Sequence, residues 1–235
     1  MKQLQNIFHR VVSMILAAVL VLGCVPSSIF AVESTPKTAD EFVPVVRFAV
    51  TSDTHIRPSS DPLNGYAQLE AVMDSVYAYS EAQPYNKLDG IFFVGDNTNR
   101  GAQSEQTYFF NYVNEHTKEG TVVQAIMGNH EFYANGYDYD GDAGPAEFMK
   151  YSGYDAVDFH LELNGYHIIM MSMNKYASYS YFSDTKLAWL KAEIEKAIAA
   201  DPNKPIFVMQ HQAPYDTMKG STGTGSDKKL RTLLD

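Results

Sequence analysis

The stretch from Thr121 to Glu131 most constrains what this 235-residue chain can fold into. Its apolar, β-branched run over 122–127 predicts a buried strand, and the run stops abruptly at Gly128. Asn129, His130 and Glu131 follow at once, and such side chains can bind metals or transfer protons. A strand that delivers polar residues to its C-terminal end is typical of a ligand site in an α/β sheet.

Three other apolar runs end in the same way. Predicted strands over 42–51, 88–94 and 205–210 lead to Asp53 and His55, to Asp96 and Asn99, and to His211. Because the carboxyl ends of parallel strands share one edge of a sheet, we expect these side chains to gather there. Asp53 and His55 are two residues apart, so on an extended backbone both side chains would point to the same side.

Apolar periodicity predicts the remaining elements. Further strands are expected over 157–163 and 166–173, joined at Asn164 and Gly165, a pair typical of a tight hairpin turn. Helices are expected over 66–81, from Ser104 as capping residue to about His116, and over 145–151, 184–200 and from Ser226 onward. Polar loops are expected over 133–144 and 220–225. This order predicts a mixed α/β sandwich with helices outside the sheets.

Composition narrows the class of protein. The net charge of −10 argues against a surface that docks nucleic acid, because phosphate backbones require a basic face. A phosphate ester is still compatible as substrate, since bound metal cations can reverse the local field. Hydrophobic residues make up 45% of the chain and charged residues 20%, which is typical of a globular protein.

The first 31 residues resemble a secretory leader. Two basic residues precede the apolar segment Val11–Gly23, which is shorter than the ~20 residues of a transmembrane span and typical of a signal-peptide core. We expect cleavage after Ala31, a linker over 32–41 and one domain over 42–235, in a protein secreted or held at the cell surface by bacterial-type export. Lipid attachment at Cys24, the single cysteine, is the alternative, and only this would place the protein on a membrane.

The polar clusters offer carboxylate, imidazole and amide groups and no thiolate, a set that suits Mn, Fe, Zn, Ni or Co. Their order along the chain resembles the calcineurin-like metallophosphoesterase superfamily over about residues 45–235. The motifs that carry this resemblance are Asp53-x-His55, Gly95-Asp96, Gly128-Asn129-His130-Glu131 and His211. The resemblance implies a four-layer α/β/β/α sandwich with mixed sheets.

The family's site, carried over by motif, would hold two divalent metal ions. It places Asp53 and His55 on the first metal, Asp96 between both metals, and Asn129 and His211 on the second. In such enzymes a hydroxide that bridges the metals attacks the phosphorus. The resemblance therefore implies hydrolysis of a phosphomonoester or phosphodiester, on a small molecule or a polymer.

The resemblance also implies roles around the metals. His130 would protonate the leaving oxygen or stabilise charge there, with Glu131 behind the ligands. Asn99 stands where many relatives carry an Asp that orients the histidine, and its amide could accept a hydrogen bond from His130. Arg100, and after it Arg57, would clamp the phosphoryl oxygens.

Two departures from the family pattern leave an alternative open. One is Asn99, and the other is that no Gly-His-x-His motif, which supplies the family's last ligands, follows His211. We therefore expect a domain incomplete at its C-terminus, with each metal one imidazole short. The alternative function is a non-catalytic metal-binding or surface-interaction module on the same scaffold.

Within the enzyme class, two subgroups are disfavoured. Asn99 occupies the place of the chromophoric tyrosine of purple acid phosphatases, and Ile56 follows His55 where nucleotidases carry glycine. The substrate itself is not set by these motifs, because loops determine it.

Overall fold

The computed structural model of the chain describes residues 43–133, 143–175, 181–221 and 228–235. The chain divides into two compact units, Met1–Val43 and Pro44–Asp235, and every described helix and strand lies in the second. The predicted leader and linker, and most of the loops predicted over 133–144 and 220–225, fall outside the described residues. Within the described part, no helix combines the length and apolar character needed to cross a membrane.

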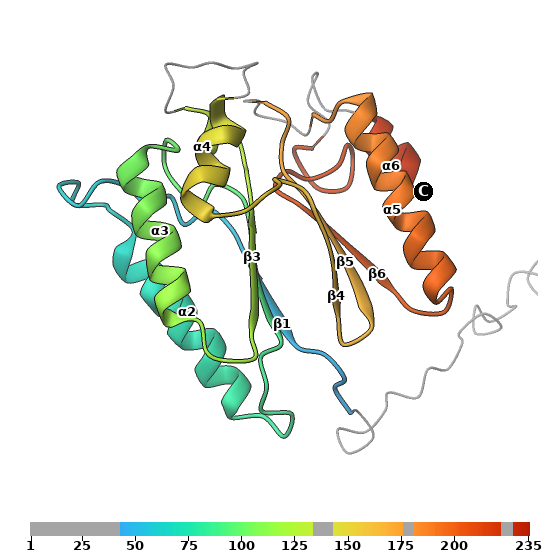
Figure 1. The fold of residues 1–235 in the computed structure, drawn as a ribbon, viewed down its shortest axis with the longest axis horizontal. Coiled ribbons are helices and arrows are strands. Elements are labelled where there is room, and N and C mark those ends of the chain that lie inside the picture. Colours follow the sequence, from blue (N-terminus) through green and yellow to red (C-terminus); the bar gives the residue numbers. More distant parts are fainter. Residues whose placement is uncertain (1–42, 134–142, 176–180, 222–227) are drawn as a thin grey trace, which may run out of the picture. The chain divides into compact units, whose positions relative to one another are not determined.

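The first sheet consists of three parallel strands, with β2 (Gly90–Val94) between β1 (Phe48–Thr51) and β3 (Val122–Ile126). Because β2 is covered on both faces, its residues are apolar throughout. Helix α2 (Tyr66–Glu81) connects β1 to β2, and α3 (Gln103–His116) connects β2 to β3 (Figure 1). Parallel strands require such crossover helices.

The second sheet is mixed, with the strand order β4, β5, β6. β4 (Phe159–Leu163) pairs antiparallel with β5 (Tyr166–Met171), which pairs parallel with β6 (Ile206–Gln210). Asn164 and Gly165 join β4 to β5 with φ values of 51° and 77°, the left-handed backbone of a type I′ turn. The predicted hairpin is therefore confirmed.

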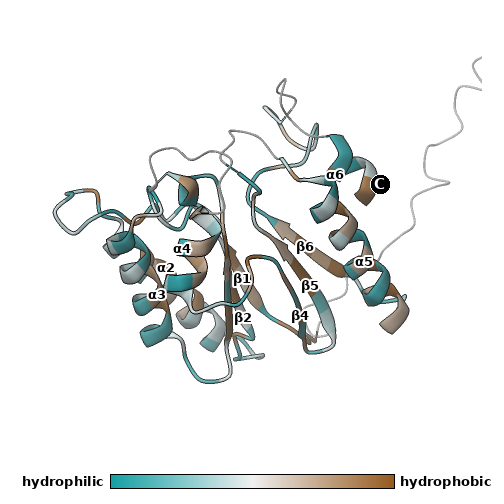
Figure 2. Cartoon of the chain, turned by 45° about the horizontal axis from the view of Figure 1, so that its top comes forward, coloured by the Kyte–Doolittle hydropathy of each residue, from teal (hydrophilic) through white to brown (hydrophobic). Residues whose placement is uncertain are grey.

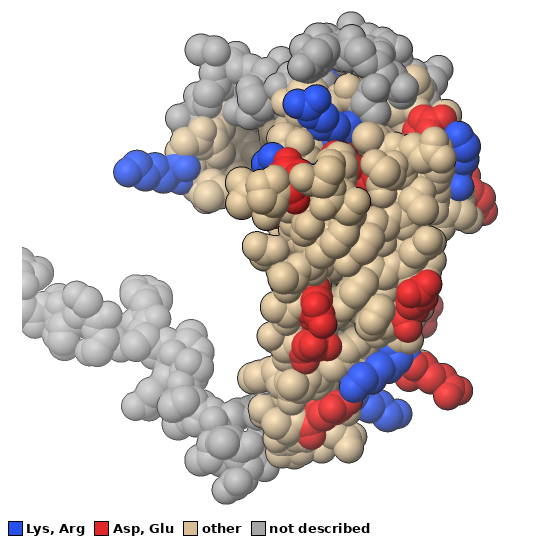
Figure 3. Space-filling model, turned by 90° about the vertical axis from the view of Figure 1, so that its left-hand side faces the viewer, with Lys and Arg blue, Asp and Glu red and all other residues tan. Residues whose placement is uncertain are grey.

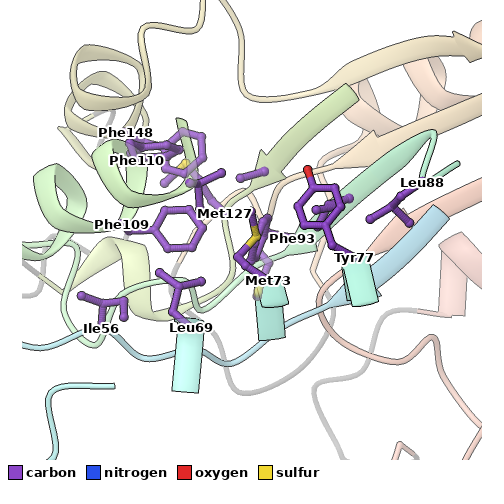
Figure 4. Packing of buried hydrophobic residues seen from close by; sticks show 14 of the residues in the cluster. Ile56, Leu69, Met73, Tyr77, Leu88, Phe93, Phe109, Phe110, Met127 and Phe148 are labelled. Carbon is purple, nitrogen blue, oxygen red and sulfur yellow. The ribbon is translucent and has the colours of Figure 1, made fainter. Parts of the chain in front are cut away.

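Three buried apolar clusters separate four layers. One lies between the first sheet and the helices α2, α3 and α4 (Ala143–Ser152), and Figure 4 shows aromatic side chains meeting there. The second fills the space between the sheets and contains Phe92, Ile126, Ile168 and Met170. The third joins the second sheet to α5 (Asp184–Ala200) and α6 (Lys228–Leu234).

Alternation along the strands assigns side chains to these layers. Phe92 enters the cluster between the sheets, whereas its neighbour Phe93 packs under the helices, as a two-residue repeat requires. Polar residues gather on the helices and loops outside (Figure 2), and the α2–α3 face carries scattered charges of both signs (Figure 3). The four-layer α/β/β/α sandwich is thereby confirmed, and of the two sheets among the described residues the second is mixed.

Some predicted boundaries are wrong for identifiable reasons. The first strand begins at Phe48 and not at residue 42, because its ladder with β2 begins at the pair Phe48 and Gly90. Ser104 does not cap α3, which begins at Gln103 after Ala102. The Glu105 carboxylate instead accepts the backbone N–H groups of Arg100 and Ala102 at 2.7 and 3.3 Å. Helix α4 begins at Ala143, two residues before the predicted start.

Tyr154 provides a test of the packing between α4 and the first sheet. It lies against Phe110 and Phe159, and burial raises the pKa of its hydroxyl to about 12 from the ordinary 10.0. A raised pKa in the folded state means that its stabilising contribution is complete below pH 10 and is lost as the pH rises toward 12. Between pH 8 and pH 11, the free energy of unfolding of the wild type should fall by about 1.3 kcal/mol more than that of Tyr154→Phe.

Urea unfolding at the two pH values measures this difference. Tyr79→Phe is the matched control, since Tyr79 is 65% exposed on α2. Equal pH dependence for the wild type and Tyr154→Phe would contradict the burial of this hydroxyl.

Candidate metal centre

The loops that follow β1, β2, β3 and β6 meet at one edge of the fold, as the sequence predicts. Asp53 donates its backbone N–H to the Gly95 carbonyl at 3.1 Å, and His55 donates to that of Asp96 at 3.1 Å. His211 Nδ1 lies 3.0 Å from the Val94 carbonyl, which ties the second sheet to the first. Side chains from both sheets are thus brought to one place.

Asp96 is the centre of this cluster. Its buried carboxylate oxygen Oδ2 lies 3.2 Å from His211 Nε2, 3.9 Å from His55 Nε2 and 3.8 Å from His130 Nε2. Two groups of three residues, each with donor atoms within 4.8 Å of one another, could hold a metal ion among the described residues. They are His55, Asp96 and His130, and Asp53, Asp96 and His211, so Asp96 belongs to both.

The backbone at these residues is not the expected one. Asp53, His55 and Asp96 have φ values of 57°, 44° and 51°, in the left-handed region that non-glycine residues rarely adopt. The extended backbone predicted from the two-residue spacing of Asp53 and His55 is therefore wrong. The two side chains nevertheless meet, with His55 Nε2 3.5 Å from Asp53 Oδ1. Such strain persists where the surrounding hydrogen bonds fix it, and it is frequent at functional sites.

Glycine is required where two of the loops touch. A Cβ atom at Gly128 would lie 2.2 Å from Asp96 Oδ1, and one at Gly95 would lie 2.6 Å from the Gly128 nitrogen. Gly95 also has a φ of 99°. The close approach of the Asp96 carboxylate to the β3 loop therefore depends on both glycines.

The orientation of His130 is fixed by main-chain atoms. Its Nδ1 lies 2.7 Å from the Asn99 carbonyl oxygen, which can only accept a hydrogen bond. Nδ1 therefore carries a proton, and in the neutral ring the lone pair of Nε2 faces Asp96. The sequence assigned this contact to the Asn99 side chain, whereas the structure assigns it to the backbone of the same residue.

Asn129 lies at the same edge, but its side chain has a protein partner. The Oδ1 atom of Asn129 accepts a hydrogen bond from Gln212 Nε2 at 2.9 Å. This hydrogen bond uses one of the two lone pairs of the oxygen, and the other could bind a metal. Gln212 was missed by sequence reasoning, and its only signal is its position directly after His211 at the end of β6.

Glu131 lies behind the cluster and binds two of its loops. Its fully buried carboxylate accepts the backbone N–H groups of Asp96, Thr98 and Gly128 at 3.0, 2.9 and 2.7 Å. The Thr98 hydroxyl adds a fourth donor at 3.0 Å. Burial and the charge of Asp96 raise the pKa of Glu131 to about 7, and these donors oppose the rise. Its expected place behind the ligands agrees with this geometry.

The charges of the cluster are strongly coupled. Burial alone would raise the pKa of Asp96, but the hydrogen bond and charge of His211 bring this pKa below its ordinary value. Burial would lower the pKa of His211, and the hydrogen bond and charge of Asp96 raise it above normal. The pKa of His55 is lowered by burial and by His130, whose ring centroid lies 4.4 Å away.

The two arginines lie beside the cluster. Arg57 and Arg100 line a cavity of about 630 Å³ that Asn99 also borders, and Arg57 pairs with Asp61 at 3.4 Å. Arg57 in addition borders a hollow of about 250 Å³ lined by Asp53 and His55. The structure therefore places Arg57, which the sequence ranked after Arg100, nearer to the candidate ligands.

The donor set fits divalent transition-metal ions. Carboxylate oxygens and imidazole nitrogens converge on Asp96 from four loops, and thiolates are absent from the sequence after residue 24. Because Asp96 belongs to both groups, its carboxylate could contact an ion held by either of them.

The family model of calcineurin-like phosphoesterases matches residues 46–235, so the chain belongs to this family. Among solved structures, the chain is similar to the purple acid phosphatase PPD1 from yellow lupin (Lupinus luteus) seeds, with a TM-score of 0.51 and 14% sequence identity. The match covers 80% of this chain and 35% of the lupin chain, and at this identity it shows a shared fold alone. The comparison with curated proteins gives no match.

A variant of Glu131 tests whether its carboxylate holds together the loops around Asp96. Glu131→Gln would turn an NH2 group toward backbone N–H donors, so at least one buried donor loses its acceptor. We expect the free energy of unfolding to fall by roughly 1–3 kcal/mol for each donor left unpaired. Urea unfolding of chelator-treated protein measures this loss.

Glu147→Gln on α4 is the matched control, because the Glu147 side chain is 36% exposed and pairs with Lys150 at 3.3 Å. Its expected cost is below about 0.5 kcal/mol. Similar costs for both variants would show that the Glu131 carboxylate does not hold the loops together.

Proposed function

We propose that the chain is an exported phosphoesterase that uses two divalent metal ions to hydrolyse a phosphomonoester or phosphodiester. The observation that carries this proposal is the position of Asp96 in both potential ligand groups. Membership of the calcineurin-like phosphoesterase family supports the reaction class. The apolar segment Val11–Gly23 behind two basic residues supports export, with lipid attachment at Cys24 as the alternative.

The ligands proposed for the metals are Asp53, His55, Asp96, Asn129 and His211. The ions are Mn, Fe, Zn, Ni or Co, which this oxygen and nitrogen set accommodates. Bound there, they would supply positive charge to the phosphoryl group and lower the pKa of an attacking water. Asn129 can join the set through the second lone pair of Oδ1, while the first accepts the hydrogen bond from Gln212.

The remaining residues position the substrate and a proton. His130 is proposed to protonate the leaving oxygen through Nε2, with the ring held by the Asn99 carbonyl. Arg57 and Arg100 are proposed to bind the phosphoryl oxygens or an adjoining anionic group, because both line the neighbouring cavity. Asp61 pairs with the Arg57 guanidinium, and a bound anion would compete with Asp61 for it.

A non-catalytic metal-binding module is the second candidate. Asn99 favours it, since an amide at the place of the orienting acid supplies no negative charge to a protonated His130. Metal binding at Asp96 without hydrolysis of any phosphate ester would support this candidate over the enzyme.

Asp96→Asn is the decisive variant for the proposed function. Loss of one charge from the shared carboxylate should lower hydrolysis of an aryl phosphate by at least ~100-fold, as direct ligands matter more than the groups that orient them. Rates measured with Mn or Zn added to the purified full chain provide the test. Asp155→Asn, at an exposed position, is the control. Equal rates for wild type and Asp96→Asn would exclude catalysis at this centre.

Variants of His130 and Asn99 test whether Asn99 acts on His130 through its side-chain amide or through its main-chain carbonyl. His130→Ala should lower kcat by about 10²–10⁴, the usual contribution of a proton-transferring residue. Asn99→Ala retains the carbonyl that binds Nδ1, so we expect less than a ~10-fold loss, under ~1.4 kcal/mol of barrier. Comparable losses in steady-state kinetics would show that the Asn99 amide, and not its carbonyl, acts on the reaction.

A further inference from the structure

A second group of metal-competent side chains lies on the second sheet, away from the candidate centre. His167 lies near the start of β5, and His160 on β4 stands opposite Ile169 in the ladder between β4 and β5, whereas the candidate centre lies beyond the C-terminal ends of β5 and β6. His160 Nε2 and His167 Nδ1 are 2.9 Å apart, and their ring centroids are separated by 5.0 Å. The phosphoesterase chemistry assigns no role to this pair.

Strand register places a carboxylate beside the pair. Phe159, Leu161 and Leu163 pack between the sheets, so His160 and Glu162 point to the outer face, which α5 covers (Figure 1). Glu162 stands directly opposite His167 in the antiparallel ladder. Side chains at such positions have Cβ atoms roughly 4.5–5.5 Å apart, so Glu162 can reach the ring of His167.

Helix α5 orients the first histidine. Glu193 Oε2 lies 2.7 Å from His160 Nδ1, and Lys196 Nζ neutralises the same carboxylate at 2.6 Å from Oε1. A carboxylate on Nδ1 leaves Nε2 of the neutral ring with its lone pair directed at His167. Carboxylates hold metal-binding histidines in this way in many proteins.

We propose that His160 and His167 bind one divalent transition-metal ion on the outer face of the second sheet, with Glu162 as a third ligand. Two imidazole nitrogens bound at ~2.0–2.1 Å, at angles between 90° and tetrahedral, lie about 2.9–3.4 Å apart. The observed 2.9 Å between the nitrogens falls at the lower limit of this range. The two nitrogens now face each other in a hydrogen bond, so each ring must turn until its lone pair points at the ion.

Binding requires one proton to move. The His167 Nδ1–H that now bridges the rings must leave this nitrogen, and it can pass through solvent to Nε2 of the same ring without a change in net charge. Glu162 must turn toward the ion, because the only groups of three preformed donors among the described residues belong to the candidate centre. Glu193 remains an orienting group, since Lys196 already occupies its other oxygen.

Zinc stoichiometry tests the proposal. The full chain is stripped with chelator, loaded with Zn²⁺, dialysed and analysed for zinc per chain, as wild type and as His167→Ala. We expect His167→Ala to hold one zinc fewer, and Glu193→Gln to weaken this zinc roughly 10–100-fold. His116→Ala is the control, because that histidine on α3 is exposed and stacks on Tyr112.

Equal zinc content in wild type and His167→Ala would overturn the proposal. Aryl phosphate hydrolysis by His167→Ala should match the wild type, so failure of this site and failure of the catalytic proposal are distinguishable. If His167→Ala does not fold, anomalous diffraction from wild-type crystals soaked in Zn²⁺ decides the question. A peak between His160 Nε2 and His167 Nδ1 supports the site, and zinc confined to the region of Asp96 overturns it.

Discussion

The buried carboxylate of Glu131 binds the loop after β2 to the loop after β3, and the candidate centre depends on this contact. Four donors converge on its two oxygens, three of them from the backbone. They fix the turn in which Asp96 adopts its left-handed conformation, and the Asp96 carboxylate then reaches His211, His55 and His130. A buried carboxylate is costly unless it is fully hydrogen-bonded, and here the donors that satisfy it are those that shape the site.

The four-layer arrangement explains why both sheets contribute to one cluster. The parallel strands of the first sheet all end at the same edge, and β6 of the second sheet ends beside them. The carbonyl of Val94, the last residue of β2, holds the His211 ring through Nδ1 and directs Nε2 at Asp96. The apolar cluster between the sheets therefore sets the distance between candidate ligands that lie more than a hundred residues apart in the chain.

The elements predicted correctly are those that a local sequence pattern marks. The helices over 66–81 and 184–200 have the predicted limits, because apolar periodicity marks both and Ser183 caps the second one. The hairpin turn followed from Asn164 and Gly165, because these residue types readily adopt the left-handed backbone of a type I′ turn. The residues gathered around Asp96 also followed from their shared place after apolar runs, although their roles as ligands remain predictions.

Contacts between segments that are distant in the chain could not be predicted from the sequence. Nothing in the residue types shows that Asp53, His55 and Asp96 adopt positive φ, because each is held by hydrogen bonds from distant segments. The same applies to the contact between Gln212 and Asn129, and to the histidine pair on the outer face, which requires the register of β4 and β5. Such features depend on tertiary structure and carry no local signal.

The contact between His130 and the Asn99 carbonyl shows which part of the family's orienting acid Asn99 can replace. A carbonyl fixes the tautomer of His130 as well as a carboxylate would, so replacement of Asp by Asn need not misplace the ring. It supplies no negative charge to stabilise an imidazolium, and that part of the acid's contribution is lost. We therefore expect the proposed proton donation by His130 to be weaker than in relatives with the acid. Esters whose leaving oxygen needs little protonation, such as aryl esters, depend least on it.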